Sequence, residues 1–268
     1  MKQLLLAVKI RCLLLALALL LPVGACARGG TAATVAILGD SQTWLGGDKC
    51  DGSRGWSKWF ALAAKPKSCR SYARSGATWT NVPATTASPQ DYSAIVSDQN
   101  VIYNQVMRLI AACRGKAQAT PSAIIIYAGT NDAWFGRKRP GRFSKTVDQA
   151  MRGSAGIASR KPGTCTSLAE SIIQDCTILK QHFPKSRLIF VTAMHSRRFS
   201  SQDLTRVNDI IDQCARRLGI PVIKLDGNIQ VNKTGGQPFT TDGVHTSVAG
   251  AKLVGSYVAR QFNRIMNQ

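Results

Sequence analysis

Short apolar runs recur along the chain between longer stretches in which apolar side chains return every three or four positions. The short runs have the length and continuity of buried strands. They cover residues 34–39, 123–128, 187–192 and 221–225, and we expect a further, more polar strand at residues 68–73. The longer amphipathic stretches predict helices. These cover residues 55–64, 98–114, 167–182, 202–218 and 247–265.

The order of these elements predicts the fold class. Strands alternate regularly with helices, which is the order of an α/β protein with a parallel sheet. Parallel sheets are covered by helices on both faces, so we expect a three-layer α/β/α sandwich. The sequence shows no internal repeat and no second domain, and residues 34–268 are expected to form a single domain.

One segment interrupts the pattern. Residues 134–164 show no apolar periodicity, and a single acid, Asp148, stands among many bases. The bases are Arg137, Lys138, Arg139, Arg142, Lys145, Arg152, Arg160 and Lys161. A loop this long inside a compact domain is usually functional or mobile. We therefore expect a basic insertion, with a solvated surface loop of no further role as the alternative.

The first 25 residues have the pattern of a secretion signal. Lys2, Lys9 and Arg11 precede an apolar core at residues 12–21, which is too short for a stable membrane span. We expect residues 1–25 to be a signal peptide.

The end of this segment resembles the lipobox of bacterial lipoproteins. In Val23-Gly24-Ala25-Cys26, cleavage before the cysteine would leave Cys26 as the candidate for lipid modification. Residues 26–33 would then form a leader. An ordinary signal cleaved nearby is the alternative, and both place the protein outside the bacterial cytoplasm, in the periplasm or at the cell surface.

Composition and charge limit the class of protein. Hydrophobic residues make up 44% of the 268 residues, which is enough for a core and excludes a disordered, collagen-like or coiled-coil chain. Thirty-five Lys and Arg stand against 14 Asp and Glu, for a formal charge of +21. Signal cleavage would remove only three bases, so the folded domain itself is strongly basic.

Six cysteines follow Cys26. They are Cys50, Cys69, Cys113, Cys165, Cys176 and Cys214. An even number in an exported chain favours disulfides, and a Cys50–Cys69 bond closing a short loop is the preferred pair. Buried free thiols are the alternative. Neither CxxC nor HExxH occurs, so nothing supports a structural zinc site.

Three expected strand exits carry polar residues. Ligands of open parallel sheets bind where the chain leaves the carboxyl ends of the strands. The first strand runs into Gly39-Asp40-Ser41, the second into Ser75-Gly76-Ala77-Thr78, and the third into Gly129-Thr130-Asn131-Asp132. We expect these turns to converge on one crevice.

A serine becomes a strong nucleophile only beside a base that a third group orients. Asp242-Gly243-Val244-His245 supplies both groups in a turn before the last helix. Asp242 can accept from Nδ1 of His245 while Nε2 faces Ser41. His182 is expected to be a surface residue at a helix end, and His195 a loop residue that could line the cleft.

Together these four blocks resemble the SGNH (GDSL-type) hydrolases, in the same order along the chain. The resemblance covers about residues 34–264. Each block alone is weak, but the four in order are a specific signal. The resemblance implies the flavodoxin-like α/β/α fold of that family and an ester hydrolase that needs no metal or organic cofactor.

The family roles carry over onto matching positions. Ser41 would be the nucleophile, His245 the general base and Asp242 its partner. The oxyanion hole would consist of the N–H groups of Ser41 and Gly76 and the side chain of Asn131. Convergent donors of this kind contribute a few kcal/mol each to transition-state stabilisation.

Other positions have weaker or missing matches. Asp40 and Asp132 are expected to hold their loops by hydrogen bonds. Gln42 stands where leucine is common, Thr246 stands where proline often follows the histidine, and the second block lacks an asparagine that often precedes its glycine. These differences affect the acyl pocket, and with it the substrate.

The resemblance therefore favours a serine esterase that deacetylates a carbohydrate or cell-envelope polymer. Alternatives are a lipase-like or lysophospholipase-like esterase, an acyltransferase that uses the same triad, and a non-catalytic lipoprotein that binds polyanions. The positive charge would attract an acidic polysaccharide, an envelope polymer or an anionic membrane surface. Nucleic acid is not expected, because the basic segment lacks a binding motif and interleaved aromatic residues.

Overall fold

The computed structural model describes residues 32–196, 198–225 and 239–268. The expected signal peptide at 1–25, the lipidation candidate Cys26 and residues 26–31 of the leader lie outside the described residues. Within the described part of the chain, no helix combines the length and apolarity that a membrane span requires.

The sheet is parallel throughout, as the alternation of elements predicts. Its strands are β1 (Thr34–Gly39), β2 (Ser68–Ser71), β3 (Ala123–Tyr127), β4 (Arg187–Val191) and β5 (Val222–Ile223). They lie in the order β2-β1-β3-β4-β5. In this order β1 and β3 lie at the centre, where apolar side chains are needed on both faces of a strand. This explains why their sequences are almost continuously apolar.

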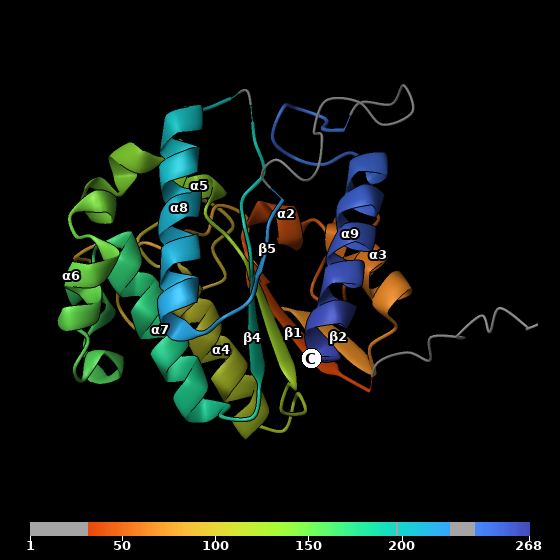
Figure 1. The fold of residues 1–268 in the computed structure, drawn as a ribbon, viewed down its shortest axis with the longest axis horizontal. Helices are drawn as coiled ribbons and strands as arrows, with labels where there is room; N and C mark the ends of the chain where they lie inside the picture. Colours follow the sequence, from red (N-terminus) through yellow and green to blue (C-terminus); the bar gives the residue numbers. More distant parts are fainter. Residues whose placement is uncertain (1–31, 197, 226–238) are drawn as a thin grey trace, which may run out of the picture.

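Helices cover both faces of the sheet (Figure 1). One layer holds α4 (Ile102–Arg114), α7 (Leu168–His182) and α8 (Ser201–Leu218); the other holds α3 (Trp56–Ala64) and α9 (Val248–Met266). Successive strand residues point to opposite faces, so Ala36 and Leu38 pack in the first core while Val35 and Ile37 pack in the second. The three-layer α/β/α sandwich is confirmed.

Sequence signals at the helix ends explain where the long helices begin. Ser167 and Glu170 form a capping box at the start of α7, and the hydroxyl groups of Ser200 and Ser247 cap α8 and α9. The helix expected from residue 98 begins later, because Val101 instead forms a bridge with Thr78.

The expectation of a long loop at residues 134–164 is wrong. The segment contains α6 (Val147–Arg152) and four short 3₁₀ helices. These are η1 (Gly136–Lys138), η2 (Pro140–Phe143), η3 (Ile157–Ser159) and η4 (Pro162–Thr164). Ile157 is buried in the core, and η3 packs against α7. This part of the segment therefore belongs to the packed domain.

Arg139 shows that this segment is anchored by polar contacts too. Its side chain is buried, with Nε donating to Oγ1 of Thr78 at 2.9 Å and Nη2 donating to the carbonyl oxygen of Ser97 at 2.7 Å. Burial lowers the pKa of Arg139. Buried guanidinium groups need such partners, and these contacts join the basic segment to the chain between β2 and α4.

The sulfur atoms of Cys50 and Cys69 lie 3.1 Å apart, and both residues are free thiols in this structure. Cys165, Cys176 and Cys214 are buried thiols, and Cys113 is half-buried. The two cysteines of the preferred pair are therefore adjacent in space, and the disulfide bond between them stays a prediction.

Asp175 is a buried carboxyl group without a hydrogen-bond partner in the described structure. It lies in α7 at 0% exposure, and neither carboxylate oxygen has a partner. Burial raises the pKa of Asp175 well above its ordinary value. The folded state therefore keeps a proton on Asp175 to a higher pH than the unfolded chain, which releases it above about pH 4.

We expect a Cys50–Cys69 disulfide in protein isolated from an oxidising compartment. The residues are 19 positions apart, and a cross-link closing a loop of that size contributes about 3 kcal/mol. Peptide mapping without reduction should recover one linked pair of peptides. Cys50→Ser should lower the Tm by about 5 °C or more, whereas Cys113→Ser, outside the pair, should lower it less. Alkylation of both Cys50 and Cys69 in unfolded, non-reduced protein would contradict the bond.

We expect Asp175→Asn to stabilise the protein at pH 7 and not at pH 4. The raised pKa means that wild-type stability falls as pH rises above the unfolded pKa, by up to about 1.4 kcal/mol per pH unit until the folded pKa is reached. Melting curves from pH 4 to pH 8 should show a Tm gap that widens with pH. The exposed Asp209→Asn is the matched control, and equal gaps at all pH values would show that Asp175 does not titrate as described.

Candidate active site

Two polar turns leave the centre of the sheet at the same edge. Gly39 at the end of β1 lies opposite Tyr127 at the end of β3. Ser41 therefore opens the short helix α2 (Ser41–Trp44) beside the exit of β3, where Asn131 lies in α5 (Thr130–Trp134). The register of two neighbouring strands thus brings both predicted residues to one crevice.

Asp40 fixes the turn that carries Ser41. Its Oδ1 accepts a hydrogen bond from the backbone N–H of Gln42 at 3.0 Å, as an N-cap residue does. Complete burial raises the pKa of Asp40 to about 6, against the effect of this hydrogen bond. Gln105 supports the turn from α4, with its side-chain amide bonded to both N–H and C=O of Gly39 at 2.8 Å. The expected loop-holding contact of Asp40 is confirmed.

Ser41, His245 and Asp242 form a continuous hydrogen-bonded chain. Nε2 of His245 lies 2.9 Å from Oγ of Ser41, and Nδ1 lies 2.6 Å from Oδ2 of Asp242. Ser41 and His245 are 204 positions apart in the sequence, so the fold alone brings them together. This is the order of contacts that a serine, its base and an orienting carboxylate require.

The hydrogen bonds around Asp242 control its charge. Partial burial acts to raise the pKa of Asp242, but hydrogen bonds from the His245 side chain and from the backbone N–H groups of His245 and Val244 outweigh it and lower the pKa to about 2. The two backbone bonds measure 2.7 and 2.9 Å. Asp242 therefore stays ionised and can balance positive charge on His245.

Contacts from three directions hold the turn at residues 242–245. Gln42 donates from its side chain to the carbonyl oxygen of Val244 at 2.6 Å, and Ser196 Oγ donates to that of Gly243 at 2.8 Å. Nε of Arg198 donates to the carbonyl oxygen of Asp242 at 2.7 Å. The position of Gln42 beside Ser41 could have indicated its role, but no local pattern marks Ser196 or Arg198.

Gly76 occupies a position that excludes a side chain. Its φ of +79° lies in the left-handed region, and a Cβ there would lie 2.5 Å from backbone atoms of Ile95 and Val96. Nδ2 of Asn131 donates to the carbonyl oxygen of Ala77 at 2.9 Å, which leaves the second amide hydrogen for a ligand.

Asp132 clamps the same two turns together. Its Oδ2 accepts from the N–H of Trp79, and its Oδ1 accepts from the N–H of Thr80, both at 2.9 Å. Oδ1 also accepts from the hydroxyl of Thr80 at 2.6 Å. Asp132 is completely buried, so each contact is shielded from water. The expected loop-holding role is confirmed, and the clamp sets the position of Asn131 relative to Gly76.

A pocket of about 350 Å³, the reaction pocket, opens beside Ser41. Gly76, Asn131 and His245 line it too, so the structure brings together all the predicted catalytic and oxyanion residues apart from Asp242, which lies behind His245. The other walls are Ser75 of the second predicted turn, residues 134, 135 and 138 of the basic segment, and residues 94–96, which the sequence did not indicate. The pocket is half open and mainly apolar on the side of residues 94–96.

The remaining histidines lie elsewhere. His182 is exposed as the last residue of α7, and His195 is exposed in the loop after β4, outside the wall of the reaction pocket. In the described ranges, no group of three or more His, Cys, Asp or Glu residues is arranged to hold a metal ion.

Comparison with known proteins shows which family the sequence matches. The model of a family described as the GDSL-like lipase/acylhydrolase family matches residues 37–253, which include Ser41, Gly76, Asn131, Asp242 and His245. No curated protein matches the sequence.

Several solved structures share the fold. A possible lipase from Chitinophaga pinensis is 15% identical, with a TM-score of 0.57 over 88% of this chain and 100% of its own. A GDSL-like lipase candidate from Bacteroides uniformis is 19% identical, with a TM-score of 0.53 over 88% and 97% of the two chains. A protein from Lactobacillus plantarum is 17% identical, with a TM-score of 0.53 over 86% and 96%. At these low sequence identities, the structural similarity shows that the fold is shared and nothing further.

We expect Asp132→Ala to lower both stability and turnover of a small ester. The substitution leaves two buried N–H groups and a hydroxyl without their acceptor, which should cost about 3 kcal/mol or more of unfolding free energy. Urea unfolding would measure the loss, and kcat with p-nitrophenyl acetate should fall about tenfold as Asn131 shifts. Asp98→Ala, at an exposed position in the neighbouring loop, is the control. Unchanged stability and kcat in Asp132→Ala would contradict the clamp.

Proposed function

The chain belongs to the GDSL-like lipase/acylhydrolase family, a family of ester hydrolases, and on that premise we propose that it cleaves carboxylic esters by a serine mechanism. Ser41 is the nucleophile, His245 the general base and Asp242 the group that orients the base. The observation that supports these roles most directly is the hydrogen-bonded chain from Ser41 Oγ through the imidazole to Asp242, with distances of 2.9 and 2.6 Å.

The first half of the reaction transfers the acyl group to the enzyme. Oγ of Ser41 attacks the ester carbonyl carbon while Nε2 of His245 takes the hydroxyl proton. The carbon–oxygen bond to the alcohol then breaks, and His245 returns the proton to the departing oxygen. The free alcohol leaves, and the acyl group remains on Ser41 as an ester.

The second half regenerates the enzyme with water. His245 takes a proton from a water molecule, whose oxygen attacks the acyl carbonyl carbon. The bond to Ser41 Oγ breaks, the proton returns to Oγ, and the carboxylic acid leaves. Asp242 stays ionised throughout, because its pKa of about 2 lies far below neutral pH.

The negative charge that develops on the carbonyl oxygen needs fixed donors. Gly76 N–H, Ser41 N–H and the free amide hydrogen of Asn131 are proposed to supply them. Such donors typically contribute about 3 kcal/mol each, because they are already oriented before charge develops. The clamp at Asp132 and the contact from Asn131 to Ala77 support this assignment, since they fix the two turns relative to each other.

We propose a short acyl group, with a carbohydrate or cell-envelope polymer as the alcohol half. A half-open reaction pocket of about 350 Å³ suits an acetyl group on a bulky alcohol. A lipase-like or lysophospholipase-like activity, which needs room for a long acyl chain, is the alternative, and the preferred acyl chain length separates the two. Acyl transfer to a sugar hydroxyl would use the same residues and is separated from hydrolysis by product analysis with an added acceptor.

The cellular setting is part of the proposal. The N-terminal signal supports export, and the lipobox supports anchoring of the mature domain through lipid on Cys26. A protein in that position first meets envelope and external polymers. A non-catalytic polyanion-binding lipoprotein would have no physical need for the Ser41–His245–Asp242 chain.

We expect the mature domain to hydrolyse p-nitrophenyl acetate faster than the butyrate and octanoate esters. Ser41→Ala and His245→Ala should each lower kcat by about four to six orders of magnitude, because the first variant lacks the nucleophile and the second lacks the base. His195→Ala, at an exposed position outside the reaction pocket, is the matched histidine control. Octanoate as the best substrate would favour the lipid esterase, and equal rates for wild type and Ser41→Ala would overturn the serine mechanism.

A further inference from the structure

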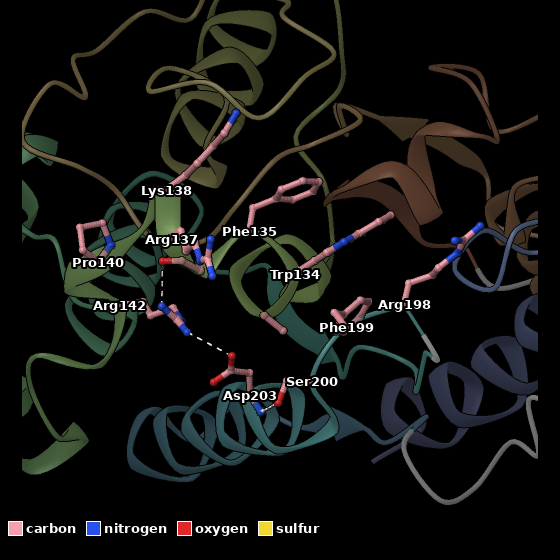
Figure 2. Close-up of a pocket in the computed structure, with 12 residues that line it drawn as sticks. Trp134, Phe135, Arg137, Lys138, Pro140, Arg142, Arg198, Phe199, Ser200 and Asp203 are labelled. Carbon is pink, nitrogen blue, oxygen red and sulfur yellow. Dashed lines mark hydrogen bonds and ion pairs between the residues drawn. The ribbon is translucent and has the colours of Figure 1, made fainter.

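A second pocket has a volume of about 610 Å³, and Figure 2 shows the side chains that line it. The two pockets share Trp134, Phe135 and Lys138 as a common wall. The second pocket, called here the aromatic-basic pocket, is lined further by Ala133, Gly136, Arg137, Pro140, Arg142, Arg198, Phe199, Ser200 and Asp203. Its volume lies within the range of pockets that bind small molecules.

Three aromatic rings form a row along this pocket. Trp134 lies between Phe135 and Phe199, with ring centroids 5.0 and 5.7 Å apart and planes inclined by 22° and 23°. Figure 2 shows Lys138 near one end of the row and Arg198 near the other. All three rings are half-buried, so they present a fixed apolar surface to a ligand.

The charge around the rings is strongly positive. Arg137, Lys138, Arg142 and Arg198 line the pocket with a single acid, Asp203. Asp203 already pairs with Arg142 at 3.3 Å. Arg137 and Lys138 are exposed, and no acidic side chain among the described residues forms an ion pair with either.

The walls of the aromatic-basic pocket are connected to the catalytic groups. Asn131 and Trp134 lie three positions apart in α5, so one helical turn carries the oxyanion donor and the central ring of the row. At the other end, Arg198 donates to the backbone of Asp242 at 2.7 Å. A ligand in this pocket would therefore lie against both sides of the reaction centre.

Resting on the esterase proposed above, we propose that the aromatic-basic pocket binds an acidic sugar unit on the alcohol side of the substrate. The enzyme would then deacylate an O-acylated acidic oligosaccharide, with the ester at Ser41 and a neighbouring carboxylate in the second pocket. The apolar face of a sugar ring packs against aromatic side chains. Guanidinium and ammonium groups form strong hydrogen bonds with carboxylates.

The observations favour a saccharide over a lipid surface. A lipid acyl chain needs a continuous apolar lining, whereas four cationic side chains surround these rings. A pocket also recognises one or two units of a polymer, whereas contact with an anionic membrane needs cations on an outer surface. Membrane binding is therefore kept as an outcome that would overturn the proposal.

Binding is tested first, with turnover removed. Mature Ser41→Ala protein would be titrated by calorimetry with hexagalacturonate and, as the neutral match, xylohexaose. We expect binding of hexagalacturonate at least about tenfold tighter, weakening as salt is added. Equal binding of the two, or capture by phosphatidylglycerol vesicles without binding of hexagalacturonate, would overturn the acidic-sugar subsite.

Variants then locate the binding to the pocket. Arg137→Gln/Lys138→Gln should lower hexagalacturonate affinity about tenfold in the Ser41→Ala background. Lys185→Gln/Arg264→Gln removes the same charge from exposed positions before β4 and near the end of α9, and should change affinity much less. Equal losses in both double variants would show that net charge, and no built subsite, attracts the polymer.

Kinetics separate this proposal from the esterase on which it rests. In the enzyme with Ser41 intact, the ratio of kcat/KM on acetylated oligogalacturonate to that on acetylated xylo-oligosaccharide should exceed about ten and should fall in Arg137→Gln/Lys138→Gln. A ratio near one, with Ser41-dependent hydrolysis of p-nitrophenyl acetate, would overturn the subsite alone. Selective binding of hexagalacturonate without any Ser41-dependent hydrolysis would overturn the esterase and leave the subsite standing.

Discussion

The alignment of β1 with β3 is the constraint on which the rest of the site depends. Because Gly39 lies opposite Tyr127, the two strands end at the same level and release their polar turns side by side. A shift of one residue in this register would turn the strand side chains to the opposite faces, away from their helices. The cores that hold Val35 and Leu38 on opposite sides of the sheet therefore also fix the distance between Ser41 and Asn131.

Two aspartates near this edge show how the same side chain takes different properties. Asp40 is completely buried, and desolvation dominates, so its pKa rises to about 6. Asp242 is only partly buried, and hydrogen bonds from its own turn lower its pKa to about 2. The site thus keeps a permanent negative charge behind His245, while the carboxyl group next to Ser41 is more easily protonated.

The sequence predicts the sheet and its long helices because these elements bury long, regular patterns. The run at Ile124 to Ile126 and the amphipathic stretch of α8 are long enough to show their periods. The 3₁₀ helices between residues 136 and 164 have one turn each, so no period can appear, and η2 and η3 pack against α7 only in the folded chain. Ser41 and His245 were identifiable because each lies in a short motif. Arg198 was not, because only the folded chain brings it to Asp242.

The short helix α5 contributes side chains to both pockets within its five residues. Asn131 faces the reaction pocket, and Trp134 separates that pocket from its neighbour. A change that reshapes the Trp134 end of this helix will therefore also displace the amide at its start. With the alcohol half of the ester in the second pocket, as proposed above, selectivity for that half and the rate of the chemical step should vary together in an evolving lineage or a protein-engineering library. New specificities would be reached more readily through the loop at residues 94–96, which lines the reaction pocket without carrying any of its catalytic side chains.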